Sequence, residues 1–396
     1  MKTTAEPQPR LTPFAYGFRP FFLGAIAYGL LGIAGWLGIR ATGAMPLLNL
    51  PPQIWHGHEM LFGFAGAAIA GFLLTAVPSW TGARGFAGWP LMVLSALWLA
   101  GRAGFAFAAS LPALAVAALE LSFLPTLAAM VAVPLLRARS RNTPLLGVLA
   151  ALWLVDATFM YALARGEPVL ASAMLRAGID VVLLLITVIG GRIVPAFTAN
   201  AFRRRGIDAP LRTNRWVDGA AIGAMILVVV TDLLAPGHNL AALAAGAAGV
   251  AHAIRLAGWQ TSRTLSEPIV WVLHLAYAWL PVGLALKAIH LISGAAWASD
   301  WLHALTIGGA ATMVVAVITR ASLGHTGREI IASRWIAAAY GLLGGAALIR
   351  VGATVATAYR EWLIWASGIL WITAFAVILL VYGPILLRAR VDGRDG

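Results

Sequence analysis

The stretch 58–80 reads HEMLFGFAGAAIAGFLLTAVPSW, and no charged side chain follows Glu59 within it. A helix needs roughly 20 mostly apolar residues to cross the hydrocarbon core of a bilayer, so this stretch alone predicts a membrane span. The rest of the chain has the same character, because 61% of its 396 residues are hydrophobic and only 11% are charged. An ordinary soluble domain has about 25% charged residues. The composition therefore excludes a water-soluble globular enzyme.

Twelve such stretches predict an all-α integral membrane protein that forms one polytopic domain. They cover residues 20–39, 58–80, 88–108, 111–135, 145–164, 173–198, 214–234, 240–258, 269–291, 301–320, 335–357 and 362–387. We expect the first stretch to stay in the membrane rather than to be cleaved as a signal peptide. Its apolar run is too long for a signal peptide, and no Ala-x-Ala-type cleavage site follows it.

The basic residues predict the orientation of these spans. Of the 28 Lys and Arg residues, 20 lie at the two ends of the chain or at every second loop, and they include Lys2 and Arg10. The opposite connections hold only Arg40, Arg165 and Arg360. By the positive-inside rule, both termini are predicted to be cytoplasmic. This asymmetry also accounts for the net charge of +13 without a nucleic-acid partner.

Three spans that run in the same direction end alike, which indicates an internal repeat. Their ends read Thr75-Ala-Val-Pro-Ser-Trp-Thr-Gly82, Arg192-Ile-Val-Pro-Ala-Phe-Thr-Ala199 and Arg320-Ala-Ser-Leu-Gly-His-Thr-Gly327. His58 and His303 each lie 24 residues before the closing glycine. Chance likeness among Ala- and Leu-rich helices is the alternative explanation. The polar and proline positions favour three tandem four-helix units, 12–141, 142–263 and 264–390, about a pseudo-threefold axis.

The chain has no cysteine, so any bound metal must rest on other ligands, and the eight histidines are the main candidates. His56 and His58 lie at the outer mouth of the second span, and His303 begins the tenth span at the same level. Imidazole-rich sites suit copper, iron or zinc. We therefore predict that His56, His58 and His303 bind a metal ion; the alternative is that each is a structural histidine. Glu59 is expected to orient one of these imidazoles by accepting a hydrogen bond from the ring nitrogen that does not bind the metal.

A second group of histidines lies near the cytoplasmic side. His252 and His274 come from adjacent antiparallel spans, each about 8–9 Å below the boundary at 1.5 Å per residue. Two such imidazoles are able to supply the axial ligands of a haem. Arg192 and Arg320 are candidates to pair with haem propionates. His325, just beyond the end of the same span as Arg320, is a further candidate haem-binding residue. The alternative is that these arginines only mark the membrane boundary.

Three carboxylates also lie inside predicted spans, namely Glu120, Asp156 and Asp180. Charged side chains within the hydrocarbon region are costly and usually face the interior of a bundle. A path for protons or substrate is one interpretation. Structural ion pairs with Arg102 and Arg350 are the other, and it is the interpretation that we favour.

The sequence resembles the NnrS family of haem- and copper-containing membrane proteins of the bacterial nitric oxide response. The residues that carry the resemblance are the following blocks: Phe18-Arg-Pro-Phe-Phe22, Trp55-His-Gly-His-Glu-Met-Leu-Phe-Gly-Phe64, Gly71-Phe-Leu-Leu-Thr-Ala-Val-Pro78, Trp80-Thr-Gly82, Gly190-Gly-Arg192 with Pro195, and His303-Ala-Leu-Thr306 through Leu323-Gly-His-Thr-Gly-Arg328. The resemblance implies a twelve-span protein of the bacterial inner membrane, with haem (b type) and copper, that relieves nitrosative stress.

These observations predict a haem- and copper-binding membrane protein that binds or converts nitric oxide, with the lipid bilayer as its surroundings. They leave open whether nitric oxide is turned over or only bound. The alternative function is a twelve-span transporter of a small molecule or metal, with His and Arg side chains along the path. The sequence has no Walker loop, Gly-x-Ser-x-Gly or His-Glu-x-x-His motif, so chemistry driven by nucleotide phosphates is not expected.

Overall fold

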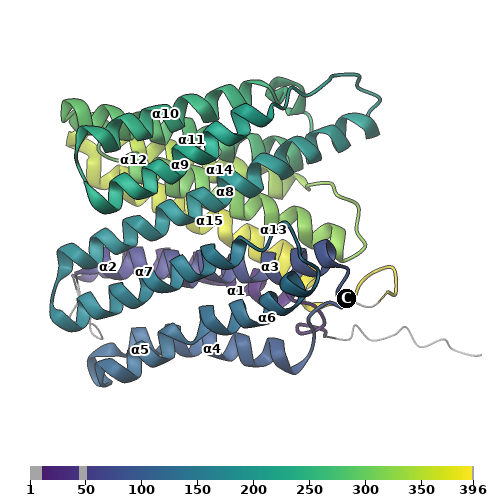
Figure 1. The fold of residues 1–396 in the computed structure, drawn as a ribbon, viewed down its shortest axis with the longest axis horizontal. Coiled ribbons are helices and arrows are strands. Elements are labelled where there is room, and N and C mark those ends of the chain that lie inside the picture. Colours follow the sequence, from purple (N-terminus) through teal and green to yellow (C-terminus); the bar gives the residue numbers. More distant parts are fainter. Residues whose placement is uncertain (1–10, 44–50, 395–396) are drawn as a thin grey trace, which may run out of the picture.

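The computed structural model describes residues 11–43 and 51–394, and Lys2 and Arg10 lie outside these ranges. Within the described residues, twelve helical spans are long and apolar enough to cross a membrane. This confirms the predicted all-α membrane fold and its number of spans. Figure 1 shows the long helices packed side by side, with their axes running in one general direction.

Most spans are single helices, and a few are built from two or three helical segments. The helices are α1 (Phe18–Thr42), α2 (Pro52–His58), η1 (Glu59–Ala65), α3 (Gly66–Thr81), α4 (Trp89–Ala106), η2 (Ala108–Ser110), α5 (Ala113–Leu121), α6 (Phe123–Arg137), α7 (Leu145–Arg165), α8 (Pro168–Arg204), α9 (Arg215–Leu234), α10 (Asn239–Ala257), η3 (Thr261–Thr264), α11 (Pro268–Ser293), η4 (Ala296–Ala298), α12 (Trp301–His303), η5 (Ala304–Ala311), α13 (Thr312–His325), α14 (Arg334–Gly352), η6 (Thr357–Tyr359) and α15 (Arg360–Leu387).

Helix α8 is longer than the sequence predicts. It has 37 residues, which at 1.5 Å per residue gives about 55 Å, whereas the hydrocarbon core is about 30 Å thick. Pro168 begins the helix, where a missing N–H costs nothing, and the helix continues through Pro195 to the basic residues Arg203 and Arg204. Both ends of α8 therefore extend beyond the span predicted at 173–198.

Two spans contain a π-helix at corresponding places. The segment η1 follows directly after His58, and η5 follows directly after His303. A π-helix closes its hydrogen bonds five residues back instead of four, and such turns are frequent at functional sites. The two histidines thus share a backbone feature that the amino-acid pattern did not reveal.

The last span packs on the first, so the two ends of the described chain meet. Helices α1 and α15 are in contact along their length. Before α1, Thr12 N donates to Leu387 O at 2.8 Å, and the buried Arg19 donates to Leu386 O at 2.9 Å and to Arg388 O at 2.6 Å. The backbone carbonyls at the end of α15 are thereby satisfied by the start of the chain.

The second, sixth and tenth spans, which are equivalent in the predicted repeat, meet around an apolar cavity of about 70 Å³. Its lining comes from α1, η1, α3, α8 and α13, as follows: Phe22, Ala65, Ala68, Ile69, Phe72, Val182, Leu185, Ile186, Ile189, Gly190, Ile193, Met313, Val314, Val317 and Ile318. A pseudo-threefold axis would run through a cavity placed in this way. The three units 12–141, 142–263 and 264–390 stay a prediction.

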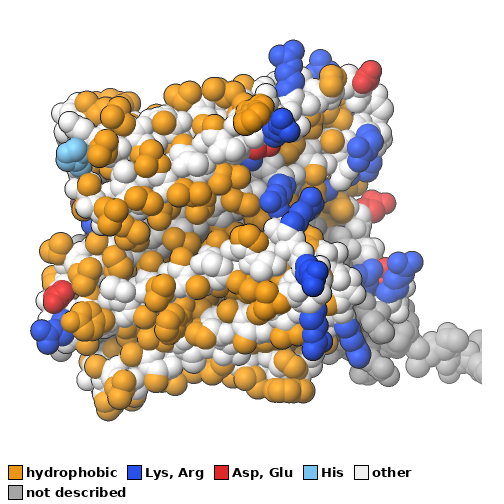
Figure 2. Space-filling model, in the orientation of Figure 1, with side chains coloured by type: hydrophobic (Ala, Val, Ile, Leu, Met, Phe, Trp, Pro, Cys, Tyr) orange, Lys and Arg blue, Asp and Glu red, His pale blue; other side chains and the backbone are white. Residues whose placement is uncertain are grey.

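Basic side chains gather at one end of the bundle. Figure 2 shows most Lys and Arg side chains at the end where the C-terminus lies, while hydrophobic side chains cover the flank between the two ends. This distribution is what a membrane protein with a cytoplasmic basic end would have.

The absence of cysteine allows a direct test of the orientation. We expect a cysteine introduced by Pro236→Cys, between α9 and α10, to react with a membrane-impermeant maleimide in intact cells. We expect Thr213→Cys, between α8 and α9 at the basic end, to react only after permeabilisation. The unsubstituted chain is the unlabelled control. Labelling of Thr213→Cys but not Pro236→Cys in intact cells would show the opposite orientation.

Candidate functional site

The most enclosed group of ionisable side chains surrounds His58, where α2 passes into η1. His58 is 0% exposed and its neighbour Glu59 is 2% exposed. His58 Nδ1 lies 2.9 Å from Glu59 Oε1. A carboxylate at that distance holds the ring proton on Nδ1 and leaves the lone pair of Nε2 free to act as a ligand. The expected contact between Glu59 and an imidazole is thus present.

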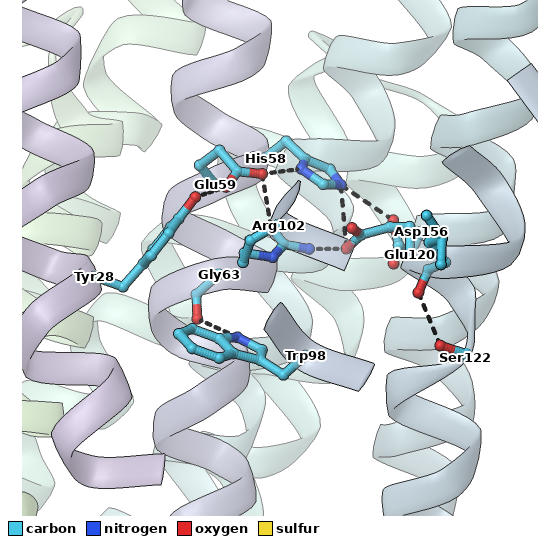
Figure 3. A network of polar contacts seen from close by, with 10 residues as sticks. Tyr28, His58, Glu59, Gly63, Trp98, Arg102, Glu120, Ser122 and Asp156 are labelled. Atoms are coloured by element: carbon cyan, nitrogen blue, oxygen red, sulfur yellow. Dashed lines mark hydrogen bonds and ion pairs between the residues drawn. The ribbon is translucent and has the colours of Figure 1, made fainter. Parts of the chain in front are cut away.

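The free side of the ring faces two more carboxylates. His58 Nε2 lies 3.4 Å from Asp156 Oδ1 on α7 and 3.7 Å from Glu120 Oε1 on α5. The three side chains are buried, and one ligand atom from each lies within 4.8 Å of the others. Figure 3 shows them converging from different helices.

Arg102 on α4 bridges two carboxylates of this group, Glu59 and Glu120. Its Nη1 donates to Glu59 Oε1 at 2.6 Å, and its Nη2 donates to Glu120 Oε1. Tyr28 on α1 donates its hydroxyl to the other oxygen of Glu59. The backbone is fixed nearby as well, because Trp98 Nε1 donates to Gly63 O of the π-helix at 3.1 Å. These contacts join four spans through one guanidinium and one carboxylate (Figure 3).

Aromatic rings close the remaining sides of His58. The imidazole stacks on Phe105 with a centroid distance of 4.0 Å and on Phe159 with 4.7 Å, and Phe62 lies at 5.0 Å. Phe105 and Phe159 are themselves fully buried. The rings exclude water from the imidazole, and they strengthen every electrostatic interaction in the group because the local dielectric is low.

The charges of this group do not cancel. Glu59, Glu120 and Asp156 bring three carboxylates, while Arg102 brings one positive charge and a neutral His58 brings none. A buried charge without a partner is very costly. The group therefore needs two further positive charges, and either a divalent cation or two protons would supply them.

The spacing of the donor atoms fits a metal ion. A tetrahedral site with metal–ligand distances of about 2.1 Å separates its ligand atoms by about 3.4 Å, close to the 3.4 and 3.7 Å around Nε2. One imidazole and two carboxylates form a mixed nitrogen and oxygen donor set, which suits Cu(II) better than Cu(I), because Cu(I) prefers sulfur ligands.

The other two predicted outer ligands lie in a different cluster. His56 stacks on Trp36 with a centroid distance of 4.8 Å, and its Nδ1 has no hydrogen-bond partner among the described residues. His303 Nδ1 lies 3.5 Å from Asp300 Oδ1. His56 lies within electrostatic reach of His303 and Arg350. The structure thus brings His56 and His303 into one neighbourhood and places His58 in another, and a site shared by all three stays a prediction.

The inner histidines are buried and fully hydrogen-bonded. His252 Nδ1 lies 2.7 Å from Tyr277 Oη, and its Nε2 lies 3.4 Å from Thr187 Oγ1. His274 Nε2 lies 2.8 Å from Thr198 Oγ1, and its Nδ1 lies 3.0 Å from Thr261 Oγ1.

The side chains between these two histidines are aromatic. The Trp259 ring lies 4.5 Å from Tyr277 and 6.3 Å from His274, between centroids. All four nitrogens of the two imidazoles have a hydroxyl partner, so none is free to bind a haem iron. The pair does not fit a haem in this arrangement, and the haem assignment stays a prediction that requires both rings to exchange partners.

The remaining predicted haem contacts are spread along the basic end. Arg192 Nη1 donates to Asn142 Oδ1 at 2.8 Å. The Arg320 guanidinium carbon lies 3.9 Å from the centroid of Phe197. The His325 ring stacks on Tyr16 at 6.1 Å and packs on Phe18 at 5.6 Å. Among the described residues, Arg192, Arg320 and His325 make no hydrogen bond, ion pair or ring contact with His252 or His274.

Groups outside the spans are also perturbed near His325. Burial raises the pKa of Tyr16 above its ordinary value. Arg390 donates to His325 O at 2.7 Å and to Asp392, and the guanidinium holds the pKa of Asp392 below its ordinary range. These contacts tie the C-terminal residues to the end of α13, which is a structural role.

Sequence reasoning found His58, Glu59 and the buried charges but missed how they combine. Glu120 and Asp156 were interpreted as structural partners of arginine, and Glu120 does pair with Arg102. Tyr28, Phe105 and Phe159 carried no signal, since aromatic residues are common in membrane helices. The available signal was the excess of carboxylates over arginines in the second to fifth spans.

Comparison with known proteins places the chain in a family. The family model described as NnrS protein matches residues 12–390, which is nearly the whole chain. No curated protein matches it.

Arg102 is expected to be essential for stability. Arg102→Gln leaves two buried carboxylates without their cation, and breaking a buried ion pair in this way typically costs about 3–5 kcal/mol. Arg40→Gln is the matched control, because Arg40 pairs with Glu361, whose side chain is 66% exposed, and exposed pairs contribute about 0–1 kcal/mol. The unfolding temperature in detergent should therefore fall strongly for Arg102→Gln and hardly at all for Arg40→Gln. Equal drops would contradict this account of the site.

Proposed function

The chain belongs to the NnrS family, and from that premise we propose that it is a metal-binding inner-membrane protein that relieves nitrosative stress by binding or converting nitric oxide. We place the metal, copper, at His58, Glu120 and Asp156. The single observation that carries the proposal is the buried group of one imidazole and two carboxylates with an uncompensated negative charge. We further propose that both termini are cytoplasmic.

The residues of the site have distinct tasks in this proposal. Glu59 orients the imidazole through Nδ1, so that Nε2 points at the metal position. Arg102 and Tyr28 hold Glu59 in turn, and such support usually tunes metal affinity by about 10–100-fold. Phe105 and Phe159 exclude water. A copper ion bound there would supply a coordination position for nitric oxide and a means of exchanging an electron with it.

The apolar cavity supports nitric oxide as the ligand. Nitric oxide is a small uncharged molecule, and apolar cavities in proteins stay dry and take up apolar guests. The lining of this cavity is entirely apolar. It includes Ala65, the last residue of the π-helix that begins beside His58.

Haem, of b type, stays part of the proposal only through the family resemblance and the two inner histidines. Because His252 and His274 do not fit a haem as they stand, no chemical step is assigned to it. His56 and His303 remain a second pair of candidate copper ligands, supported by the free Nδ1 of His56.

Transport of a small molecule or metal is the second candidate function. Buried ion pairs within several spans favour it, because ionisable residues inside the membrane often mark the paths of transporters. Metal analysis discriminates between the two candidates, since a transporter that lacks a resident metal would be purified without one.

Metal content is expected to depend on His58. His58→Ala removes the only nitrogen ligand of the proposed site, so the purified variant should lose its metal by elemental analysis. The control is His238→Ala, which changes an exposed histidine that caps α10 and should retain the metal. His303→Ala should retain the metal at His58 as well. A stable wild-type protein without metal would refute the proposal.

Haem content is expected to depend on the inner histidines. If haem binds at the predicted place, His274→Ala and His252→Ala should each abolish most of the visible haem absorbance, whereas His58→Ala should leave it unchanged. The measurement is the visible spectrum of the purified proteins. Unchanged absorbance in both inner variants would show that the haem, where present, has other ligands.

A further inference from the structure

A second buried group of charges lies away from the His58 site, where α8, α9 and α11 meet. Lys287 Nζ on α11 donates to Asp232 Oδ2 on α9, and the ammonium lies 4.8 Å from the centroid of Trp301. Asp180 on α8 is 3% exposed. Its Oδ2 has no hydrogen-bond partner among the described residues.

The carboxyl groups of Asp180 and Asp232 approach each other within hydrogen-bonding reach. The charged groups that face Asp180 are Asp232, Lys287 and, one turn earlier on its own helix, Arg176. Lys287 is already paired with Asp232, and no ion pair joins Arg176 to Asp180 among the described residues. One carboxylate of the group therefore lacks a direct cationic partner.

The composition of the group favours a proton over a metal ion. Apart from Arg176, which forms no ion pair with the group, two carboxylates and one ammonium leave a single negative charge, which one proton cancels and a divalent cation would overcompensate. A carboxylate without a partner inside a membrane is costly, and a proton shared by two neighbouring carboxyl groups removes that cost at once.

Asp232 brings the group to the surface near one end of the bundle. Asp232 lies two residues before the end of α9, and its side chain is 13% exposed, whereas that of Lys287 is 2% exposed. This end of α9 is the one opposite to the basic loop at Thr213. A proton from that side meets Asp232 first and Asp180 behind it.

We propose that Asp180, Asp232 and Lys287 form an exchangeable proton-binding site, which holds one proton between the two carboxyl groups. The step is the addition of H⁺ to a carboxylate oxygen, with no other bond formed or broken. The site is independent of the metal at His58 and stands whether or not that metal is found. In either candidate function it supplies a buried proton inside the helical bundle.

The test is infrared spectroscopy of the full-length protein in lipid nanodiscs near neutral pH. The spectrum of the wild type minus that of Asp180→Asn isolates this site from other protonated carboxyl groups. We expect a C=O stretching band of one protonated carboxyl group in the difference spectrum, and we expect it to shift in D₂O. Glu361→Gln, which changes an exposed carboxylate paired with Arg40, should show no such band.

Two further variants check the charge count. In Asp232→Asn, Lys287 becomes free to pair with Asp180, so the band should again be lost. In Lys287→Met, the ammonium is gone and both carboxyl groups should be protonated. The C=O stretching band of this group should then have twice the intensity that it has in the wild type. Lys287→Met also decides the question if Asp180→Asn fails to fold.

A difference spectrum without the band in a folded Asp180→Asn protein would overturn the proposal. So would a band that does not shift in D₂O, because the proton would then not exchange with water. A Lys287→Met protein with an unchanged band would also overturn it.

Discussion

The pairing of Arg102 with Glu59 and Glu120 is the interaction on which the candidate site depends. Within a bilayer, a charged side chain has no water to solvate it, so it must bring its partner with it. One guanidinium reaches two carboxylates, and one of those carboxylates holds His58. Removing Arg102 would therefore leave uncompensated charge and would also free the residue that orients the imidazole.

Contacts between ionisable side chains also connect the predicted units to one another. Asp156 on α7 meets His58 on α2, Lys287 on α11 meets Asp232 on α9, and Arg40 on α1 meets Glu361 on α15. In each case, a residue from the first span of one predicted unit pairs with the unit before it. The last pair closes the ring back onto the first helix. A charge pair between apolar helices has few alternative partners, so it fixes their register as well as their contact.

The sequence predicted the features that depend on a local pattern of residues. It did not predict the contacts between residues that lie far apart in the chain. Twelve spans follow from apolar stretches, because the bilayer imposes a length that each stretch meets on its own. The contact between His58 and Asp156 joins residues 98 positions apart, and no local pattern encodes it. His56 and His58 were grouped by depth, but residues two positions apart on a helix point about 200° apart. Helical geometry therefore sends one ring toward Trp36 and the other toward Phe105.

The clusters around His58, Asp180 and Asp300 differ in their balance of charge from ordinary structural ion pairs, in which each acidic group is matched by one basic group. Acid is in excess around His58 and around Asp180, so both groups call for a cation or protons. The third cluster has the opposite imbalance, because Asp300 is shared by Arg350 and Arg360. Excess positive charge disfavours protonated imidazoles, and metals bind the neutral ring, but the same charge repels a metal cation. A metal at His56 and His303 would therefore have to overcome this repulsion, whereas a metal at His58 would be attracted by the surrounding carboxylates.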